Sequence, residues 1–406
     1  MQLTVERLGH LGDGIAQGPY GPVIVPRALP GETITGTLED DHLEDVRIVT
    51  PSLDRVRPPC RHAASCGGCQ VQHVSDDVVR NWRTDTVKAA LAAQGLEAEF
   101  LPMHVSPPQS RRRASVAARR TKKGALVGFH GRASDTIVEI PDCQLLSTQV
   151  TAVLPLARDL AIRGGSRKGE LTVTITASDS GADVAVSGGK DPDVQLRADL
   201  AGLAEGAGLA RLTWNGETIA QRVPPFQNIG RAQVAPPPGA FLQATAEGEA
   251  ALLADVRDIV GKARKVVDLF AGCGTFSIPL AETAEVHAVE GEKAMTAALD
   301  RGWRDAQGLK KVTTEARDLF RRPLTPDELN RHDAIVLDPP RAGAAAQVAE
   351  IARCGVPSIA YVSCNPSTFA RDARALVDSG YRLDSLRIAD QFRWSAHVEL
   401  VARLTR

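Results

Sequence analysis

From about residue 240 to the C-terminus, short apolar runs typical of strands alternate with amphipathic stretches typical of helices. This alternation predicts a parallel sheet whose strands are joined by helices, and it is the strongest constraint on the fold of the chain. The carboxyl ends of the strands in such a sheet are where ligands bind. The predicted strands are 265–270, 285–290, 312–316, 333–338, 357–363, 381–387 and 397–403.

The first two strand ends together predict a nucleoside cofactor. The first strand runs into residues 271–275, Ala-Gly-Cys-Gly-Thr, where two glycines allow a tight turn and a close approach of the backbone to a ligand. A phosphate-binding turn usually has a third glycine, so this stretch alone is also compatible with a simple turn. The second strand ends at Glu290, where nucleoside-binding folds place the carboxylate that binds ribose hydroxyls.

Two later strand ends carry candidate reacting groups. Asp338 precedes two prolines, which prevent a helix and fix the loop, although an ordinary proline-rich turn has the same pattern. Arg341 stands in place of the aromatic residue that would indicate stacking on an amino-bearing base. Cys364 ends a strand just before a predicted helix, whose N-terminus favours the thiolate. We interpret Cys364 as a nucleophile, and Cys273 and Cys354 as buried packing residues.

A thiolate nucleophile needs a partner that transfers protons, and the last predicted strand supplies two candidates, His397 and Glu399. In a strand these two side chains share one face, opposite Val398 and Leu400. A half-exposed edge strand would have the same pattern. The sequence therefore leaves both residues as candidates.

Four of the seven cysteines form a separate pattern. Three of them fall within ten residues and a fourth lies far downstream, at Cys60, Cys66, Cys69 and Cys143. An odd total argues against a disulfide framework. One compact trio with a remote fourth thiolate suits an iron–sulfur cluster better than zinc, whose sites usually show two short pairs. His62 and His73 are alternative zinc ligands, although surface histidines would look the same.

Proline-containing linkers divide the rest of the chain. Residues 1–52 contain short β-prone runs separated by glycine and proline turns, which predicts a small barrel. Residues 53–240 contain the cysteines, a helix predicted over 76–94 and then mostly strands. A proline run at 236–239 marks the boundary to the domain at 241–406.

Charge and hydropathy limit the partners. The net charge is −1, so nucleic-acid binding has to come from local clusters, and residues 111–123 carry seven positive charges. Such a run is either a solvated face or a contact for a phosphate backbone. No stretch approaches the roughly 18 apolar residues of a membrane span, and the first residues lack the apolar core of a signal peptide. We expect a cytoplasmic protein without a membrane partner.

On these residues the chain resembles the bacterial RNA uracil-5 methyltransferases, most closely those that act on large-subunit ribosomal RNA, over nearly its whole length. The resemblance implies a multi-domain α/β protein. Its parts would be an N-terminal OB-like RNA-binding barrel of the TRAM type over 1–52, a central mostly-β domain with a 4Fe-4S site over 53–240, and a Rossmann-like class I methyltransferase domain over 241–406. The cluster ligands that it implies are Cys60, Cys66, Cys69 and Cys143.

The resemblance also implies the reaction and its residues. Cys364 matches the family's nucleophile and Glu399 its general base. The implied function is S-adenosylmethionine-dependent methylation of C5 of a uridine, most closely in 23S rRNA, by a monomer whose cluster has no redox role. The alternatives are a tRNA uridine-5 methyltransferase, an RNA cytosine-5 methyltransferase and a non-catalytic iron–sulfur RNA-binding protein. The implied S-adenosylmethionine contacts are Gln243, Phe270, Thr275, Glu290, Asp318 and Asp338, of which Thr275 replaces the family's usual Asn.

Overall fold

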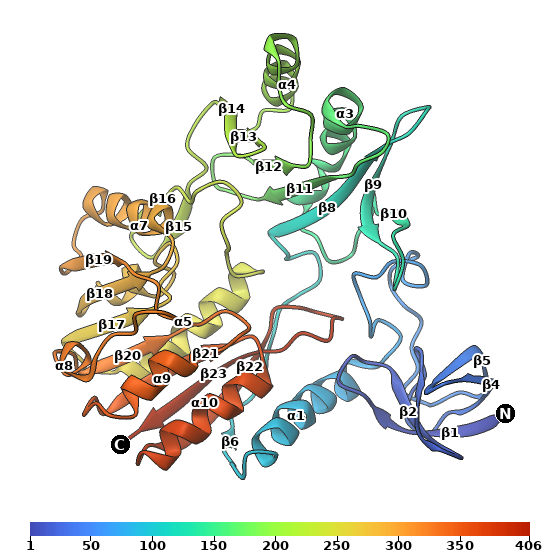
Figure 1. Cartoon of the computed structure of the whole chain (residues 1–406), viewed down its shortest axis with the longest axis horizontal. Helices are drawn as coiled ribbons and strands as arrows, with labels where there is room; N and C mark the ends of the chain where they lie inside the picture. Colours follow the sequence, from blue (N-terminus) through green and yellow to red (C-terminus); the bar gives the residue numbers. More distant parts are fainter.

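The computed structural model describes all 406 residues and builds the chain from a barrel and two large sheets (Figure 1). The N-terminal barrel is closed, with strand order β1-β2-β3-β5-β4, as predicted for this region. Its core is small and apolar, with Val5, Ile34 and Leu43 among its buried side chains. The strands are β1 (Gln2–Leu8), β2 (Gly14–Gly18), β3 (Gly21–Val25), β4 (Thr33–Glu39) and β5 (His42–Thr50).

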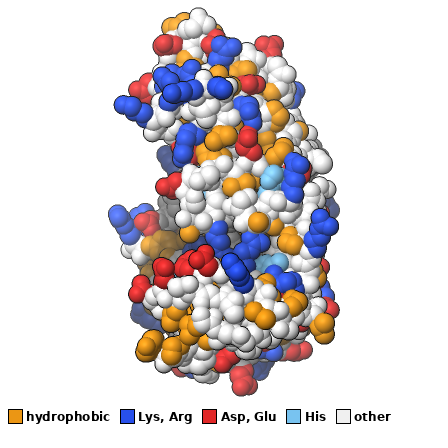
Figure 2. All heavy atoms as spheres, turned by 90° about the vertical axis from the view of Figure 1, so that its right-hand side faces the viewer, with side chains coloured by type: hydrophobic (Ala, Val, Ile, Leu, Met, Phe, Trp, Pro, Cys, Tyr) orange, Lys and Arg blue, Asp and Glu red, His pale blue; other side chains and the backbone are white.

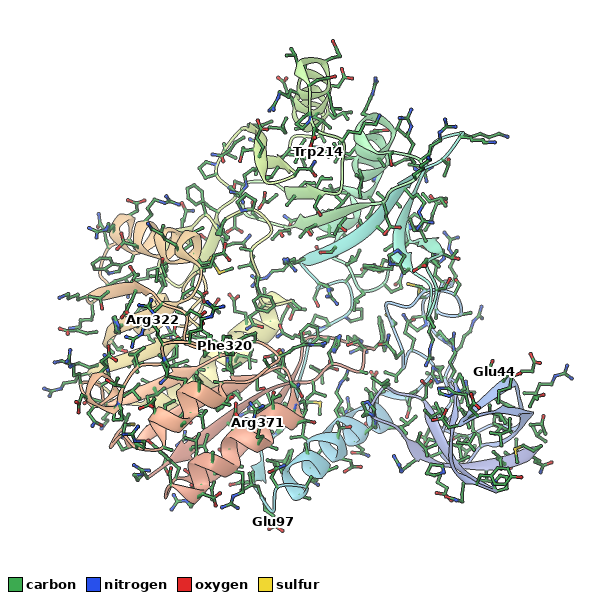
Figure 3. All side chains as sticks on the ribbon, viewed as in Figure 1. Glu44, Glu97, Trp214, Phe320, Arg322 and Arg371 are labelled. Atoms are coloured by element: carbon green, nitrogen blue, oxygen red, sulfur yellow. The ribbon has the colours of Figure 1, made fainter.

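The central part of the chain is a seven-stranded sheet of order β10-β9-β8-β11-β12-β13-β14. Its core contains the fully buried Trp214 (labelled in Figure 3), against whose ring Gly164 and Gly189 lie so closely that a Cβ on either would clash. The elements are β8 (Arg113–Arg120), β9 (Ala125–His130), β10 (Ile137–Glu139), α2 (Thr148–Thr151), α3 (Leu154–Gly164), β11 (Leu171–Thr176), β12 (Asp183–Ser187), α4 (Val194–Gly206), β13 (Arg211–Trp214) and β14 (Glu217–Gln221).

The C-terminal sheet has the strand order β19-β18-β17-β20-β21-β23-β22-β6, and its strands β19 to β21 are parallel. A hairpin, β15 (Gln227–Ile229) and β16 (Ala232–Val234), and helix α5 (Ala246–Val260) lead into it. The remaining elements are β17 (Lys265–Leu269), α6 (Ser277–Leu280), β18 (Glu285–Glu290), α7 (Lys293–Asp305), β19 (Val312–Ala316), α8 (Pro326–Leu329), β20 (Ala334–Leu337), α9 (Ala345–Ile351), β21 (Ser358–Ser363), α10 (Pro366–Asp378), β22 (Arg382–Asp390) and β23 (Glu399–Thr405).

All seven strands predicted for this region are present, and both faces of the sheet are covered by helices. Val267 and Leu269 pack on the side of α9 and α10, whereas Val266 packs on the side of α5 and α7. The last strand was predicted two residues too early. The chain turns at Ser395, whose hydroxyl accepts a hydrogen bond from the backbone N–H of His397 (3.2 Å), so His397 lies before β23 and not on its face.

Residues 76–105 precede the central sheet in the chain but pack on the C-terminal sheet. Helix α1 (Asp76–Ala92) lies against α10, and the short strands β6 (Glu99–Phe100) and β7 (His104–Val105) pair with β22 (Figure 1). None of the helices combines the length and apolar character that crossing a bilayer requires.

A buried ion pair ties α1 to the loop that leads into β23. Arg83, whose side chain is 1% exposed, binds Asp390, which is 4% exposed. The same guanidinium donates hydrogen bonds to the backbone carbonyls of Ser395 (2.9 Å) and Phe392 (3.3 Å). One side chain of the N-terminal half therefore holds both ends of the loop 390–395.

Replacing Arg83 by Met should lower the free energy of unfolding by about 3–5 kcal/mol, because Asp390 would remain buried without its partner. The double variant R83M/D390L should recover much of this loss, since no isolated charge is left in the core. Urea unfolding of both variants measures the difference. A single variant as stable as the parent protein would contradict a structural role for the pair.

Candidate active site

The eight residues predicted to bind the cofactor or to react line one cavity of about 630 Å³. The cavity lies where β17, β18, β20 and β21 end, which is the edge of the sheet expected from the strand pattern. The segment before helix α5, the loop after β19 and the loop before β23 contribute further walls. The eight residues are Gln243, Phe270, Thr275, Glu290, Asp318, Asp338, Cys364 and Glu399.

The glycine turn after β17 is tight and is fixed by Glu290. Phe270 and Gly272 both have a positive φ, of 63° and 55°, so the backbone turns sharply away from the strand. Glu290 accepts hydrogen bonds from the backbone N–H groups of Gly272 (3.0 Å) and Glu292 (2.9 Å). Its carboxylate is thereby held at the cavity with lone pairs still available for a ligand.

Two acids lie near this turn, Asp338 at the cavity and Asp268 fully buried. Burial raises the pKa of Asp338 to about 7, and the negative charges of Asp268 and Glu290 act in the same direction. Burial also raises the pKa of Asp268 to about 7, although its Oδ2 accepts a hydrogen bond from the Ser277 hydroxyl (2.5 Å). Asp268 was not predicted as a site residue, because it lies inside a strand that reads as apolar.

Glu399 is buried beside Gln391, another residue that the sequence analysis missed. Burial, followed by the charge of Asp338, holds the pKa of Glu399 well above its usual value. The Gln391 side-chain amide donates to Glu399 (3.3 Å) and to the side-chain oxygen of Gln243 (2.6 Å), while its own oxygen accepts from the backbone of Ala244 (2.9 Å). Gln391 thus links Glu399, the predicted general base, to Gln243, a predicted cofactor contact. No spacing pattern in the sequence indicates this role of Gln391.

The thiol of Cys364 is half-buried at the same cavity. Burial raises its pKa to about 11, with Glu399 and Asp338 acting in the same direction and Arg341 opposing them. Helix α10 does begin directly after it, with Asn365 as N-cap. The helix N-terminus was expected to favour the thiolate, but burial and the two acids raise the pKa of the thiol.

Arg341 supplies a positive charge to the cavity and lies against the ring of His397. The Arg341 guanidinium contacts the His397 ring, with 3.1 Å to Nε2. Burial, then the charges of Arg341 and Arg111, lower the pKa of His397. The backbone carbonyl of Arg341 accepts hydrogen bonds from the side chains of Asn365 (3.0 Å) and Thr368 (3.2 Å). This cation is therefore fixed to the start of α10, beside Cys364.

None of the four clustered cysteines lines this cavity, and all seven cysteines of the chain are free thiols. Burial raises the pKa of Cys69 to about 12, and Cys143, Cys66 and Cys60 act in the same direction. No three His, Cys, Asp or Glu side chains have the spacing needed to hold a single metal ion. His62 Nε2 lies 2.8 Å from a carboxylate oxygen of Asp142, and both ring nitrogens of His73 are buried without a hydrogen-bond partner, so a zinc site with either histidine stays an alternative prediction.

The basic run 111–123 does not form a continuous surface stripe. Arg112 donates to the backbone carbonyl of Gln243 (3.0 Å) and pairs with Glu249, and Arg113 donates to the carbonyl of Gly239 (2.9 Å). On the face shown in Figure 2, Lys and Arg side chains are interspersed with Asp and Glu around a central hollow. Arg112 and Arg113 therefore hold the start of β8 to the segment 239–249, whereas Arg111 lines the cavity.

Several known proteins are similar to this chain. A family model described as tRNA (uracil-5-)-methyltransferase matches residues 232–406. An uncharacterized RNA methyltransferase of Brucella suis is 44% identical over 100% of this chain and 98% of its own length. The 23S rRNA (uracil(1939)-C(5))-methyltransferase RlmD of Halomonas elongata is 32% identical over 98% of this chain and 88% of its own.

A solved structure has the same fold. It is the Pyrococcus abyssi tRNA (uracil-54, C5)-methyltransferase in complex with S-adenosyl-L-homocysteine, with a TM-score of 0.77. The two chains are 22% identical, and the match covers 100% of this chain and 99% of the other. It supports the arrangement of an N-terminal barrel followed by mixed α/β structure.

The charges around Cys364 predict how its reactivity depends on pH. Only the thiolate reacts with iodoacetamide, so alkylation of Cys364 should accelerate as the pH rises towards 11. The variant E399Q removes a negative charge that raises the pKa of the thiol, and should speed alkylation at pH 8 by about tenfold for each unit that the pKa falls. R341M should slow it. Mass mapping of the modified peptide measures the rate, with C364S as the blank, and no acceleration in E399Q would contradict the electrostatic account.

Proposed function

Because the chain belongs to the S-adenosylmethionine-dependent RNA uracil-5 methyltransferase family, we propose that it methylates C5 of a uridine in 23S rRNA through a covalent adduct of Cys364 with C6. The observation that carries this proposal is the cavity that brings Cys364 and Glu399 beside Gln243, Glu290 and Asp338. The relative from Halomonas elongata favours ribosomal RNA, and its similarity extends over nearly the whole chain. We further propose that the protein acts as a monomer in the cytoplasm.

The reaction explains why a thiol and an acid are needed together. C5 of uracil is too weak a nucleophile to attack a sulfonium methyl group unaided. Addition of the Cys364 thiolate to C6 pushes electrons onto C5 and O4, and C5 then takes the methyl group, releasing S-adenosylhomocysteine. The Glu399 carboxylate removes the C5 proton, the electrons of that bond form the C5–C6 double bond, and the Cys364 thiolate leaves.

The raised pKa values fit a site that becomes active when its ligands bind. At pH 7 the thiol of Cys364, with a pKa of about 11, is protonated in the free protein. A positive sulfonium bound near Asp338 and Glu399 would lower the pKa of all three groups, because it stabilises their charged forms. A larger share of the Cys364 thiol would then be ionised when the cofactor is bound.

The geometry also requires an unstacked target. Cys364 is half-buried in its cavity, so it cannot reach C6 of a base inside a helix, and the uridine has to be flipped out or to lie in a loop. We propose that the barrel at 1–52 is a TRAM-like RNA-binding module. It carries eight acidic side chains against three arginines, a net charge of −5, so its contribution to RNA binding would not come from neutralising phosphates.

We also propose that Cys60, Cys66, Cys69 and Cys143 hold a 4Fe-4S cluster in the central domain, 53–240. Burial and then the charges of neighbouring cysteines raise the pKa of Cys66, Cys69 and Cys143, which supports a cluster of nearby thiols, and none of the four is in a disulfide. A cubane cluster separates its four ligands by its own width, so the lack of a single-ion spacing is compatible with it. The cluster would stabilise the loop 60–69 and supply no step of the reaction.

The adduct can be trapped with RNA that contains 5-fluorouridine, because fluorine cannot be removed as a proton. The parent protein should form a covalent complex that depends on S-adenosylmethionine, C364A should form none, and C354A should behave like the parent. With ordinary RNA, E399Q should lose about 10²–10⁴-fold in turnover, since its general base is gone. Persistence of the complex in C364A would falsify the assignment of the nucleophile.

Mapping of the methylated base separates the alternatives. Loss of 5-methyluridine from 23S rRNA in cells that lack the gene is the expected result. Loss from tRNA, or loss of 5-methylcytidine, would support the other two methyltransferases instead. Absence of any S-adenosylmethionine binding would leave a non-catalytic RNA-binding protein.

The cluster makes a prediction of its own. Anaerobically purified protein should be brown and contain iron and sulfide, whereas C66S should lose colour and iron, because a 4Fe-4S cluster needs all four thiolates. C354S is the matched control, since Cys354 is buried in the other domain, and it should keep both. A colourless parent protein whose four thiols all react with alkylating reagents would contradict the cluster.

A further inference from the structure

The loop after β19 forms one wall of the cavity and has its own anchor. Asp318, Leu319 and Phe320 line the cavity, and the carboxylate of Asp318 caps its own turn by accepting from the backbone N–H of Phe320 (3.0 Å) and of Arg321 (3.3 Å). Asp318 was predicted as a cofactor contact from the family resemblance. Neither Phe320 nor Arg317 was predicted as a site residue.

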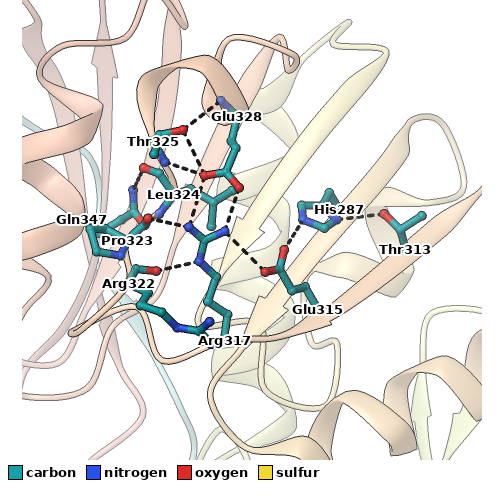
Figure 4. Close-up of polar contacts among 10 residues, drawn as sticks. All are labelled: His287, Thr313, Glu315, Arg317, Arg322, Pro323, Leu324, Thr325, Glu328 and Gln347. Carbon is teal, nitrogen blue, oxygen red and sulfur yellow. Dashed lines mark hydrogen bonds and ion pairs between the residues drawn. The ribbon is translucent and has the colours of Figure 1, made fainter.

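Arg317 is that anchor (Figure 4). Its Nε donates to the carbonyl of Arg322 (2.7 Å) and its Nη2 to that of Pro323 (2.8 Å). Both Nη atoms bind the carboxylate of Glu328, at 2.8 and 3.2 Å, and Nη1 also lies 3.3 Å from Glu315. All five N–H donors of the guanidinium are therefore used, four of them within the loop and helix α8 that follow it.

Glu328, the carboxylate that binds Arg317, is also held in place. Glu328 accepts hydrogen bonds from the backbone N–H (2.8 Å) and the hydroxyl (3.0 Å) of Thr325, in a capping box of α8. The hydrogen bond from Arg317 is the main cause that lowers the pKa of Glu328 to about 2. This carboxylate is thus charged at every pH of interest, so the ion pair between Arg317 and Glu328 persists.

The loop that Arg317 holds in place presents an exposed aromatic ring to the cavity. Phe320 is 47% exposed, and its ring centroid lies 5.4 Å from that of Phe270, with the planes tilted by 56°. Figure 3 labels Phe320 close to Arg322 of the same loop. An exposed aromatic face beside a cavity that also holds Glu290 suits a flat heteroaromatic ring attached to a ribose.

We propose that Phe320 binds the adenine ring of the cofactor together with Phe270, and that Arg317 is a positioning residue that holds Phe320 in place. This inference rests on the proposed function only in taking S-adenosylmethionine as the ligand. Glu290 would hold the ribose on the side of the glycine turn, and Phe320 would cover the base on the side of the loop.

Calorimetry with S-adenosylhomocysteine tests the inference without RNA. F320A should weaken binding about tenfold or more, because base–aromatic stacking is lost, while F320Y should stay within about twofold of the parent. The same loss is expected with 5′-methylthioadenosine, which keeps the base and ribose and lacks the amino acid. Unchanged affinity in F320A would overturn the role of Phe320.

A double-mutant cycle tests Arg317. R317M should weaken binding in the parent but change little further in F320A, because it acts through Phe320. It should raise the KM for S-adenosylmethionine while leaving kcat at saturation nearly unchanged. R317K, which keeps the charge but loses the planar fork, should lose less. Additive losses in the cycle would overturn the positioning role.

The matched control is Arg222, which likewise holds a loop through backbone carbonyls, of Leu209 (3.3 Å) and Ser180 (2.8 Å), but far from the cavity in the central sheet. R222M should leave S-adenosylhomocysteine affinity unchanged, and an equal loss there would reduce the Arg317 effect to general destabilisation. If the parent protein binds S-adenosylhomocysteine and the variants behave as expected while uridine is not methylated, the inference stands and the proposed substrate fails. If the parent does not bind it, both fail.

Discussion

The site depends on the reversal of strand order between β17 and β20, because the segments that follow these neighbouring strands diverge and leave a crevice at the sheet edge. Asp268 and Asp338 come from these two strands, and burial raises the pKa of each to about 7. The Oδ1 atom of Asp268 has no hydrogen-bond partner. Asp338 lines the cavity, whereas Asp268 is buried outside its lining, and such acids cost stability unless a positive group compensates them. A sulfonium and an ammonium group on one molecule would supply that charge.

The reacting groups reach this crevice through contacts made by distant parts of the chain. Arg83 on α1 holds the loop 390–395 by its ion pair and two carbonyls, and Gln391 in that loop binds both Glu399 and Gln243. The position of Glu399, the proposed general base, is thus set by the N-terminal half of the chain as well as by the C-terminal sheet. Arg112 does the same from the central sheet, by binding the carbonyl of Gln243.

Sequence patterns predicted the elements and the ends of the strands, because alternating apolar residues and glycine or proline turns are local properties. Glu290, Asp338 and Cys364 could be found in this way, since each lies at the end of a predicted strand. Gln391, Asp268 and Arg317 could not, because their importance lies in contacts with residues far away in the sequence or in burial inside an apolar run. His397 was placed on β23 because an alternating pattern cannot show where a preceding turn ends. The helix N-terminus at Cys364 was given too much weight because the charges of Glu399 and Asp338 only act once the chain is folded.

The distribution of charge argues for recognition of a single extruded base more than of a long phosphate tract. The barrel has a net charge of −5, and Arg112, Arg113 and Arg119 are engaged in internal contacts. The remaining cations near the cavity are Arg111, whose guanidinium lies 5.9 Å from the ring of Phe392, and Arg341, which contacts His397. Under the proposed function, these two cations beside aromatic rings would bind a flipped nucleotide through stacking and one or two phosphates. Affinity for such a target depends on the ease of unstacking the base, so the RNA structure around the uridine would contribute as much to selectivity as its sequence.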